Sequence, residues 1–198
     1  TEIYTLSLHD ALPISWERVF MFREHDFSGQ LVEQFASYHR QSYACKVGVG
    51  DVLIGAAQTV AEYNGAAKAS HVRDKIIEMN QLNETLYCGC IACASEGRRE
   101  PSGTYYVDTL LANVHKQNVT RFPYEIARLA QDIAGGIMVT CPSEDDLKSP
   151  EVGKWVSKYF HTVKSVPVEH RIRILRLIEN LTMRSEEHTS ELQSRQSI

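Results

Sequence analysis

The sequence lacks an excess of positive charge, long apolar runs and an even set of cysteines. The net charge is -4, from 21 Lys and Arg against 25 Asp and Glu, so nothing in it predicts nucleic acid or an anionic membrane as a partner. Its apolar runs, such as residues 133–139, are far shorter than the roughly 20 residues of a bilayer-spanning helix, which predicts a soluble protein without a membrane partner. The five cysteines follow no convincing signal peptide, which favours reduced thiols and a cytoplasmic location.

The two ends of the sequence do not resemble the rest of it. Residues 1–15 show neither capping residues nor a sustained period, and residues 184–198 are polar and follow an amphipathic helix without a stop signal. Both ends resemble in-frame translations of the adapters that are ligated to DNA fragments for short-read sequencing. We therefore expect two non-native segments here, flanking an authentic fragment, residues 16–183, of a longer protein. Ordinary disordered tails are the alternative.

Between these ends the hydrophobic pattern is helical. Residues 16–22 alternate between apolar and polar side chains, which predicts a short strand remnant at the start. Helical spacing of apolar residues predicts helices over residues 30–42, 52–62, 69–94, 108–119, 123–137, 151–161 and 167–181. Short connections between these helices favour antiparallel packing. The expected fold class is therefore mainly α, an antiparallel helical bundle.

Three cysteines lie close together, at Cys88, Cys90 and Cys93, and include a C-x-x-C spacing. Residues two and three apart on a regular helix do not point to one apex, and no second ligand pair follows at zinc-finger spacing. We expect these thiols to pack among small helix residues rather than to bind a metal.

A predicted helix ends in two glycines at residues 131–136, Gln-Asp-Ile-Ala-Gly-Gly. A helix C-cap explains one of the glycines. The second leaves room for another backbone or for a ligand such as a pyrophosphate or an adenosine. Both interpretations stay open from the residues alone.

The densest group of reactive side chains lies at residues 39–46. It combines the imidazole of His39, the phenol of Tyr43, the thiol of Cys45 and the ammonium of Lys46. An imidazole and a soft thiolate suit iron or zinc, and a histidine beside iron can act as a base. The phenol and the ammonium can stabilise a developing oxyanion. Because two ligands do not complete a cluster, the others must come from elsewhere in the chain or from a partner.

Four segments of the chain resemble the 4-hydroxybutyryl-CoA dehydratase/vinylacetyl-CoA delta-isomerase family, and the likeness extends over essentially all of residues 16–183. The segments are residues 39–55, 68–75, 82–87 and 116–129. The resemblance implies an acyl-CoA-dehydrogenase-like fold, FAD and a 4Fe-4S cluster, an acyl-CoA substrate, a homotetramer, and dehydration by a flavin-assisted radical route. It also implies that residues 16–27 end a middle β domain and that residues 28–183 form most of the C-terminal helical domain.

The resemblance also gives individual residues a role. His39 matches the cluster-ligating histidine and base of the family, Cys45 matches a cluster cysteine, and Tyr43 and Lys46 match active-site positions. Residues that contact FAD from a neighbouring subunit are matched by Gln131, Asp132, Ile133, Ala134, Gly135 and Gly136. The family's two other cluster cysteines belong to its N-terminal part, so the isolated chain is expected to be inactive.

The chain departs from the family in one spacing. Only Ala44 stands between Tyr43 and Cys45, where the family has two glycines, so His39 and Cys45 are six residues apart rather than seven. On a regular helix, seven residues return to the same face within about 20°, whereas six residues end about 120° away. Ligation of one cluster by both side chains therefore requires the segment to unwind or bulge locally.

Two other functions are compatible with the same helices. A flavin monooxygenase of the 4-hydroxyphenylacetate hydroxylase type would keep the fold without the cluster, and the shortened spacing favours it. A helical oligomerisation module without catalysis would use apolar helices such as residues 52–61 for subunit packing. Retained iron would exclude the first, and assembly that depends on flavin would count against the second.

Overall fold

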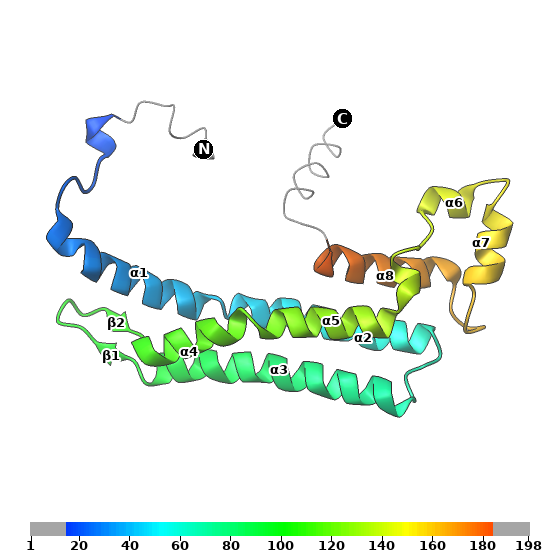
Figure 1. Ribbon diagram of the computed structural model, residues 1–198, viewed down its shortest axis with the longest axis horizontal. Coiled ribbons are helices and arrows are strands. Elements are labelled where there is room, and N and C mark those ends of the chain that lie inside the picture. Colours follow the sequence, from blue (N-terminus) through cyan, green and yellow to red (C-terminus); the bar gives the residue numbers. More distant parts are fainter. Residues whose placement is uncertain (1–14, 184–198) are drawn as a thin grey trace, which may run out of the picture. The chain divides into compact units, whose positions relative to one another are not determined.

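The computed structural model describes residues 15–183, and its ordered elements are almost entirely helical (Figure 1). The expected adapter-like segments, residues 1–15 and 184–198, lie outside these residues apart from Ser15. The chain divides into two compact units after Ala36. The helical class predicted from the sequence is confirmed.

The first unit contains no strand among its described residues. The segment expected to be a strand forms a 3₁₀ turn at Trp16–Arg18 instead, and a second 3₁₀ turn at His25–Phe27 leads into α1 (Ser28–Ser42). The predicted strand remnant is therefore wrong. Alternation alone cannot form a strand, because a strand also needs a hydrogen-bonded neighbour and a covered face. The assignment of residues 16–27 to a preceding β domain stays a prediction.

The second unit holds the end of α1 and the remaining elements. These are α2 (Cys45–Tyr63), α3 (Ser70–Ser95), β1 (Arg98–Arg99), β2 (Tyr105–Tyr106), α4 (Thr109–Val119), α5 (Phe122–Ala134), α6 (Glu144–Lys148), α7 (Gly153–Phe160) and α8 (Val168–Thr182). Helix α2 packs against α3, α5 and α8, and α4 packs along α3 (Figure 1). Strands β1 and β2 form an antiparallel hairpin in a stretch for which the sequence predicted no helix or strand.

The helix boundaries follow local capping signals, but α5 ends three residues before its predicted end, α6 was not predicted, and several helices begin elsewhere than predicted. The Asp108 side chain accepts from the Leu111 amide at 2.7 Å and caps α4, and Gly65, with a φ of 72°, follows the C-cap of α2. Helix α2 begins at Cys45, seven residues before the predicted start, and α7 begins at Gly153 rather than at residue 151. Tertiary packing of α2 on α3 explains the early start of α2, because the glycines near its start disfavour a helix locally.

The core is formed by one apolar cluster shared by α2, α3, α5 and α8. Its fully buried members include Ala57, Val60, Met79, Ala130, Leu175 and Ile178. By length and composition alone, the stretch His25–Tyr63 is the one segment of residues 15–183 that could cross a membrane. Ala57 and Val60 of α2 are buried in this core. The core helices of globular domains can be as long and as apolar as a membrane-spanning helix, so length and composition do not distinguish the two.

A buried histidine lies where α4 packs on α3. His115 is 1% exposed, neither of its ring nitrogens has a hydrogen-bond partner, and its ring lies against Gly89. Burial lowers the pKa of His115 below its ordinary value of 6.5, because the protonated ring is poorly solvated there. Folding therefore favours the neutral form of His115.

This histidine is expected to make folding pH-dependent. Since the folded pKa lies below the unfolded value of 6.5, its contribution is complete above that pH and is lost as the pH falls, by up to about 1.4 kcal/mol per pH unit. The substitution His115→Leu should weaken this dependence between about pH 7 and about pH 5 without lowering the free energy of unfolding at neutral pH. Urea titrations at several pH values measure this, with exposed His161→Leu as the control. An unchanged pH dependence in His115→Leu would contradict it.

Candidate functional site

The helix is interrupted between Ser42 and Cys45. Here the amides of Ala44, Lys46 and Val47 bond to carbonyls three residues back, at 3.2, 2.9 and 3.0 Å, in the 3₁₀ pattern. A 3₁₀ residue turns about 120° instead of about 100°, so each such residue brings Cys45 about 20° closer to the face of His39. The local departure from a regular helix, which joint ligation by His39 and Cys45 requires, is therefore found at this position.

Tyr43 lies at the centre of the interrupted segment. Its ring meets the His39 ring edge to face, with centroids 4.9 Å apart and planes at 72°. The ammonium of Lys116, from α4, lies 3.9 Å from the centroid of the Tyr43 ring, which is a cation–π distance. The sequence resemblance included Lys116 in a matching segment but gave it no role. A helix far along the chain therefore brings this lysine to the predicted site.

Neighbouring elements hold the last turns of α1 in place. The Tyr106 hydroxyl of β2 donates to the buried Ser37 hydroxyl at 3.1 Å, and the Arg40 guanidinium donates to the Asn113 side chain of α4. The Gln41 amide lies 3.4 Å from the Cys90 sulfur of α3. These contacts fix the turns that carry His39. The hairpin, which the sequence did not predict, supplies one of them.

His39 and Cys45 provide two donors of the kind that iron accepts. Both side chains are exposed, so both are accessible to ligands from outside this chain. Within residues 15–183, no group of three or more His, Cys, Asp or Glu side chains could hold a metal ion. A cluster with four ligands would therefore need further donors from outside these residues.

The cysteines of α3 differ from one another in exposure. Cys88 is exposed, Cys90 is half-buried and Cys93 is fully buried in a small cluster with Val107 and Ala112. Burial raises the pKa of the Cys93 thiol. Cys93 is therefore an inert packing residue, as the sequence predicted, whereas the same prediction is wrong for the exposed Cys88.

The stretch Gln131–Gly136 ends α5, and only some of its side chains are accessible to a ligand. Ile133 and Ala134 are buried in the core, and Asp132 forms an ion pair with Lys75 of α3. This hydrogen bond lowers the pKa of Asp132. Gly135 has a φ of 76° and caps the helix, which requires glycine. Side-chain contacts to a cofactor are thus restricted to Gln131 and Asp132, with backbone contacts at the glycines.

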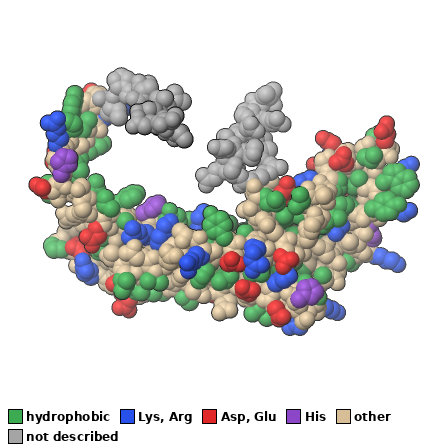
Figure 2. Space-filling view, viewed as in Figure 1, with side chains coloured by type: hydrophobic (Ala, Val, Ile, Leu, Met, Phe, Trp, Pro, Cys, Tyr) green, Lys and Arg blue, Asp and Glu red, His purple; other side chains and the backbone are tan. Residues whose placement is uncertain are grey.

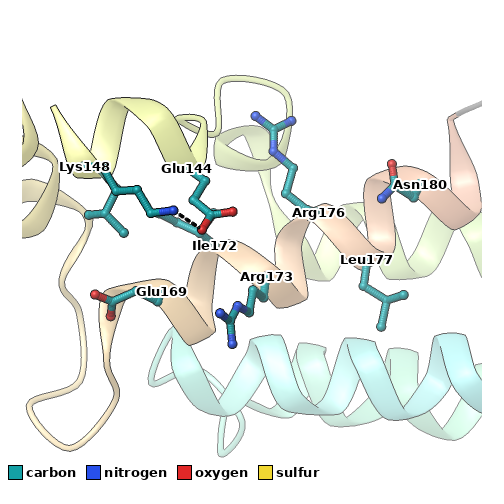
Figure 3. Close-up of a pocket in the computed structure, with 9 residues that line it drawn as sticks. Glu144, Lys148, Glu169, Ile172, Arg173, Arg176, Leu177 and Asn180 are labelled. Atoms are coloured by element: carbon teal, nitrogen blue, oxygen red, sulfur yellow. Dashed lines mark ion pairs between the residues drawn. The ribbon is translucent and has the colours of Figure 1, made fainter. Parts of the chain in front are cut away.

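A groove of about 550 Å³ lies between α6 and α8, and none of the site residues predicted from the sequence lines it. Its apolar wall is formed by Leu147, Ile172 and Leu177. Glu144 and Lys148 point toward one another as an ion pair of 2.7 Å, while Arg173 and Arg176 extend to opposite sides of α8 (Figure 3). The polar side chains do not converge, so the groove lacks the arrangement of a small-molecule site.

Hydrophobic side chains and lysines are exposed together on α7 (Figure 2). The Trp155 and Tyr159 rings stack with centroids 6.2 Å apart, and Trp155 is 48% exposed. The ammonium of Lys158 lies 5.3 Å from the Tyr159 ring. Exposed aromatic side chains of this kind are typical of surfaces that become covered in an assembly.

The chain is similar in sequence to a protein family and to several known proteins. Residues 28–196 match the family described as 4-hydroxyphenylacetate 3-hydroxylase C terminal. A 4-hydroxybutyryl-CoA dehydratase/vinylacetyl-CoA-delta-isomerase from Clostridium aminobutyricum is 56% identical over 187 residues, which are 90% of this chain and 38% of that protein. The oxygenase component of 4-hydroxyphenylacetate 3-monooxygenase from Thermus thermophilus is 22% identical over 185 residues, 92% of this chain and 38% of that protein.

Solved structures give the same order of similarity. An oxygen-tolerant archaeal 4-hydroxybutyryl-CoA dehydratase from N. maritimus superposes with a TM-score of 0.82 at 58% identity, over 86% of this chain and 34% of that one. The oxygenase component of 4-hydroxyphenylacetate 3-monooxygenase in complex with FAD superposes with a TM-score of 0.78 at 22% identity, over 90% of this chain and 38% of that one. The chain therefore spans little more than a third of the relatives that it matches.

Proposed function

Because the chain belongs to the 4-hydroxyphenylacetate 3-hydroxylase C-terminal family, we propose that it is the helical C-terminal part of an FAD- and 4Fe-4S-dependent dehydratase. The whole protein would convert 4-hydroxybutyryl-CoA to crotonyl-CoA and isomerise vinylacetyl-CoA. The observation that carries this proposal is 56% identity to a protein with both activities, against 22% to a monooxygenase component. A cytoplasmic homotetramer is part of the same proposal, and the exposed aromatic surface of α7 supports assembly.

Residues 39–46 would then have different roles in the elimination. His39 and Cys45 would hold the cluster together with ligands from the rest of the protein, and His39 would also take the proton that elimination removes. Tyr43 and Lys46 would donate hydrogen bonds to the thioester oxygen as it gains charge. When bound, the cluster would supply a Lewis acid for the leaving hydroxyl, and FAD would carry the transient electron.

FAD would lie against the end of α5 in a neighbouring subunit. Gln131 and Asp132 retain accessible side chains there, and the positive φ of Gly135 leaves the backbone open to a close approach. Ile133 and Ala134 would contribute through their backbone only, because their side chains fill the core.

A chimera tests the proposal on a complete protein. Residues 28–183 replace the matching segment of the Clostridium aminobutyricum dehydratase, and the product is purified without oxygen. We expect about four irons and one FAD per subunit, together with formation of crotonyl-CoA. A matched control carries the corresponding segment of the Thermus thermophilus monooxygenase component and should form no crotonyl-CoA.

The other two functions predict different outcomes for the same chimera. Flavin without iron would favour the monooxygenase type. Assembly without either cofactor would favour an oligomerisation module. Either result would overturn the dehydratase proposal.

A further inference from the structure

A buried asparagine on α3 contacts the beginning of α2. Asn83 is 2% exposed, and its amide nitrogen donates to the Val47 carbonyl at 3.1 Å and to the Asp51 carboxylate at 2.7 Å. Both partners lie in the first two turns of α2, directly after Cys45 and Lys46. Asn83 lies in one of the segments that resemble the family, residues 82–87, and the resemblance implies no role for it.

The surroundings of Asn83 require an amide at this position. The two acceptors, a carbonyl and a carboxylate, can be satisfied only by a donor, and the NH₂ group supplies two hydrogens. The amide oxygen faces Gly50, where an added Cβ would lie 2.1 Å away. Gly50 therefore lets α3 approach α2 closely enough for both hydrogen bonds. The two acceptors orient the amide through its nitrogen, and its buried oxygen has no hydrogen-bond partner among the described residues.

The interruption before α2 makes the rotation of this helix depend on contacts of its own. The turn at Tyr43 and Ala44 separates α2 from α1, so the contacts that hold the end of α1 do not by themselves fix the rotation of α2. Those contacts come from the hairpin, α4 and Cys90 of α3, and they include the Tyr38 hydroxyl, which donates to the Tyr105 carbonyl. Asn83 is the corresponding contact on the other side of the turn.

We propose that Asn83 is a positioning residue, which fixes the rotation of the first turns of α2 and so the directions in which Cys45 and Lys46 project. The hydrogen-bonded contact is independent of any cofactor. Its role in ligand placement rests on the proposed function. Asn83 touches neither substrate nor cluster in this arrangement and acts only through the α2 backbone.

Amide hydrogen exchange of the 198-residue chain tests the contact itself. Asn83→Asp places a carboxylate against the Val47 carbonyl and Asp51, so exchange at Gly48 to Asp51 should accelerate by about 10- to 100-fold. The matched control is Asn80→Asp on the same helix, since Asn80 is exposed and donates to the Ile76 carbonyl of its own helix at 2.8 Å. Exchange in this control should stay within about twofold of the parent chain.

A second substitution provides a rescue. When Asn83→Asp is combined with Asp51→Asn, the carboxylate introduced on α3 again faces an amide donor on α2, so exchange should recover in part, since the Val47 carbonyl still lacks its donor. Gly50→Ala should loosen the same amides as Asn83→Asp, whereas Gly55→Ala, which meets no atom within 4 Å, should not. Equal exchange in Asn83→Asp and Asn80→Asp, acceleration that extends uniformly to the core amides of Ala57 and Val60, or the absence of any recovery in the double variant would each overturn the proposal.

The cluster spectrum of the chimera tests the consequence for the site. Asn83→Asp should change the visible and electron paramagnetic resonance spectra of the bound cluster, Asn80→Asp should leave them unchanged, and the addition of Asp51→Asn should shift them back toward those of the parent chimera. If the spectra of the Asn83→Asp variant equalled those of the parent chimera, the positioning role would be overturned. A chimera that binds no cluster with Asn83 intact would count against the proposed function, while the exchange measurement would still decide whether the contact exists.

Discussion

Replacing Cys45 with serine in the chimera is expected to remove most of the bound iron and to lower crotonyl-CoA formation by at least about 100-fold. A hydroxyl is a harder and much weaker ligand for iron than a thiolate. Loss of a residue that merely orients a metal ligand already costs about 10- to 100-fold in affinity or activity, and Cys45 would be a direct ligand. Iron content and anaerobic turnover of the purified variant measure both effects.

Cys88 provides the control for this substitution. Its side chain is exposed like that of Cys45, but it lies on α3, and no role is proposed for it. Cys88→Ser should keep its iron and its turnover within about twofold of the parent chimera. If Cys45→Ser retained four irons and full turnover, Cys45 would not be a ligand, and the six-residue spacing would mark a protein without the family's cluster geometry.

Replacing Arg171 with methionine is expected to lower the free energy of unfolding by about 2–4 kcal/mol. Arg171 of α8 is 7% exposed and donates to the Asn64 side chain at 2.9 Å and to the Phe160 carbonyl at 2.7 Å. Its guanidinium also lies 4.8 Å from the Phe160 ring. Burial lowers its pKa, yet these partners compensate the buried charge. Methionine would leave both acceptors without a donor.

Urea or thermal unfolding of the chain measures the effect. A loss of this size corresponds to a fall of about 5–15 °C in Tm for a domain of this length. The control is Arg173→Met, two residues along the same helix, where the side chain is exposed and a change within about 0.5 kcal/mol is expected. Equal stability of the two variants would show that Arg171 does not join α2, α7 and α8.

Most of the helical fold was predictable from the sequence because helices are local. Their apolar period and their capping residues lie within a few positions of one another, as at Asp108, which caps α4. The short helix α6 was missed although a local capping box starts it, and the other main errors fell on features that depend on distant partners. The alternating residues 16–22 found no neighbouring strand, whereas Arg98–Arg99 and Tyr105–Tyr106, which carry no clear strand signal, pair with each other.

The sequence determined which reactive groups are present and how they are spaced. It selected His39, Tyr43, Cys45 and Lys46, and it required a departure from a regular helix if His39 and Cys45 were to share a ligand. Only the tertiary structure decided what surrounds them. Lys116 reaches the Tyr43 ring and Asn83 fixes the start of α2 because α4 and α3 pack beside this segment. Contacts between residues tens of positions apart depend on how helices pack, and no local period or capping signal encodes that packing.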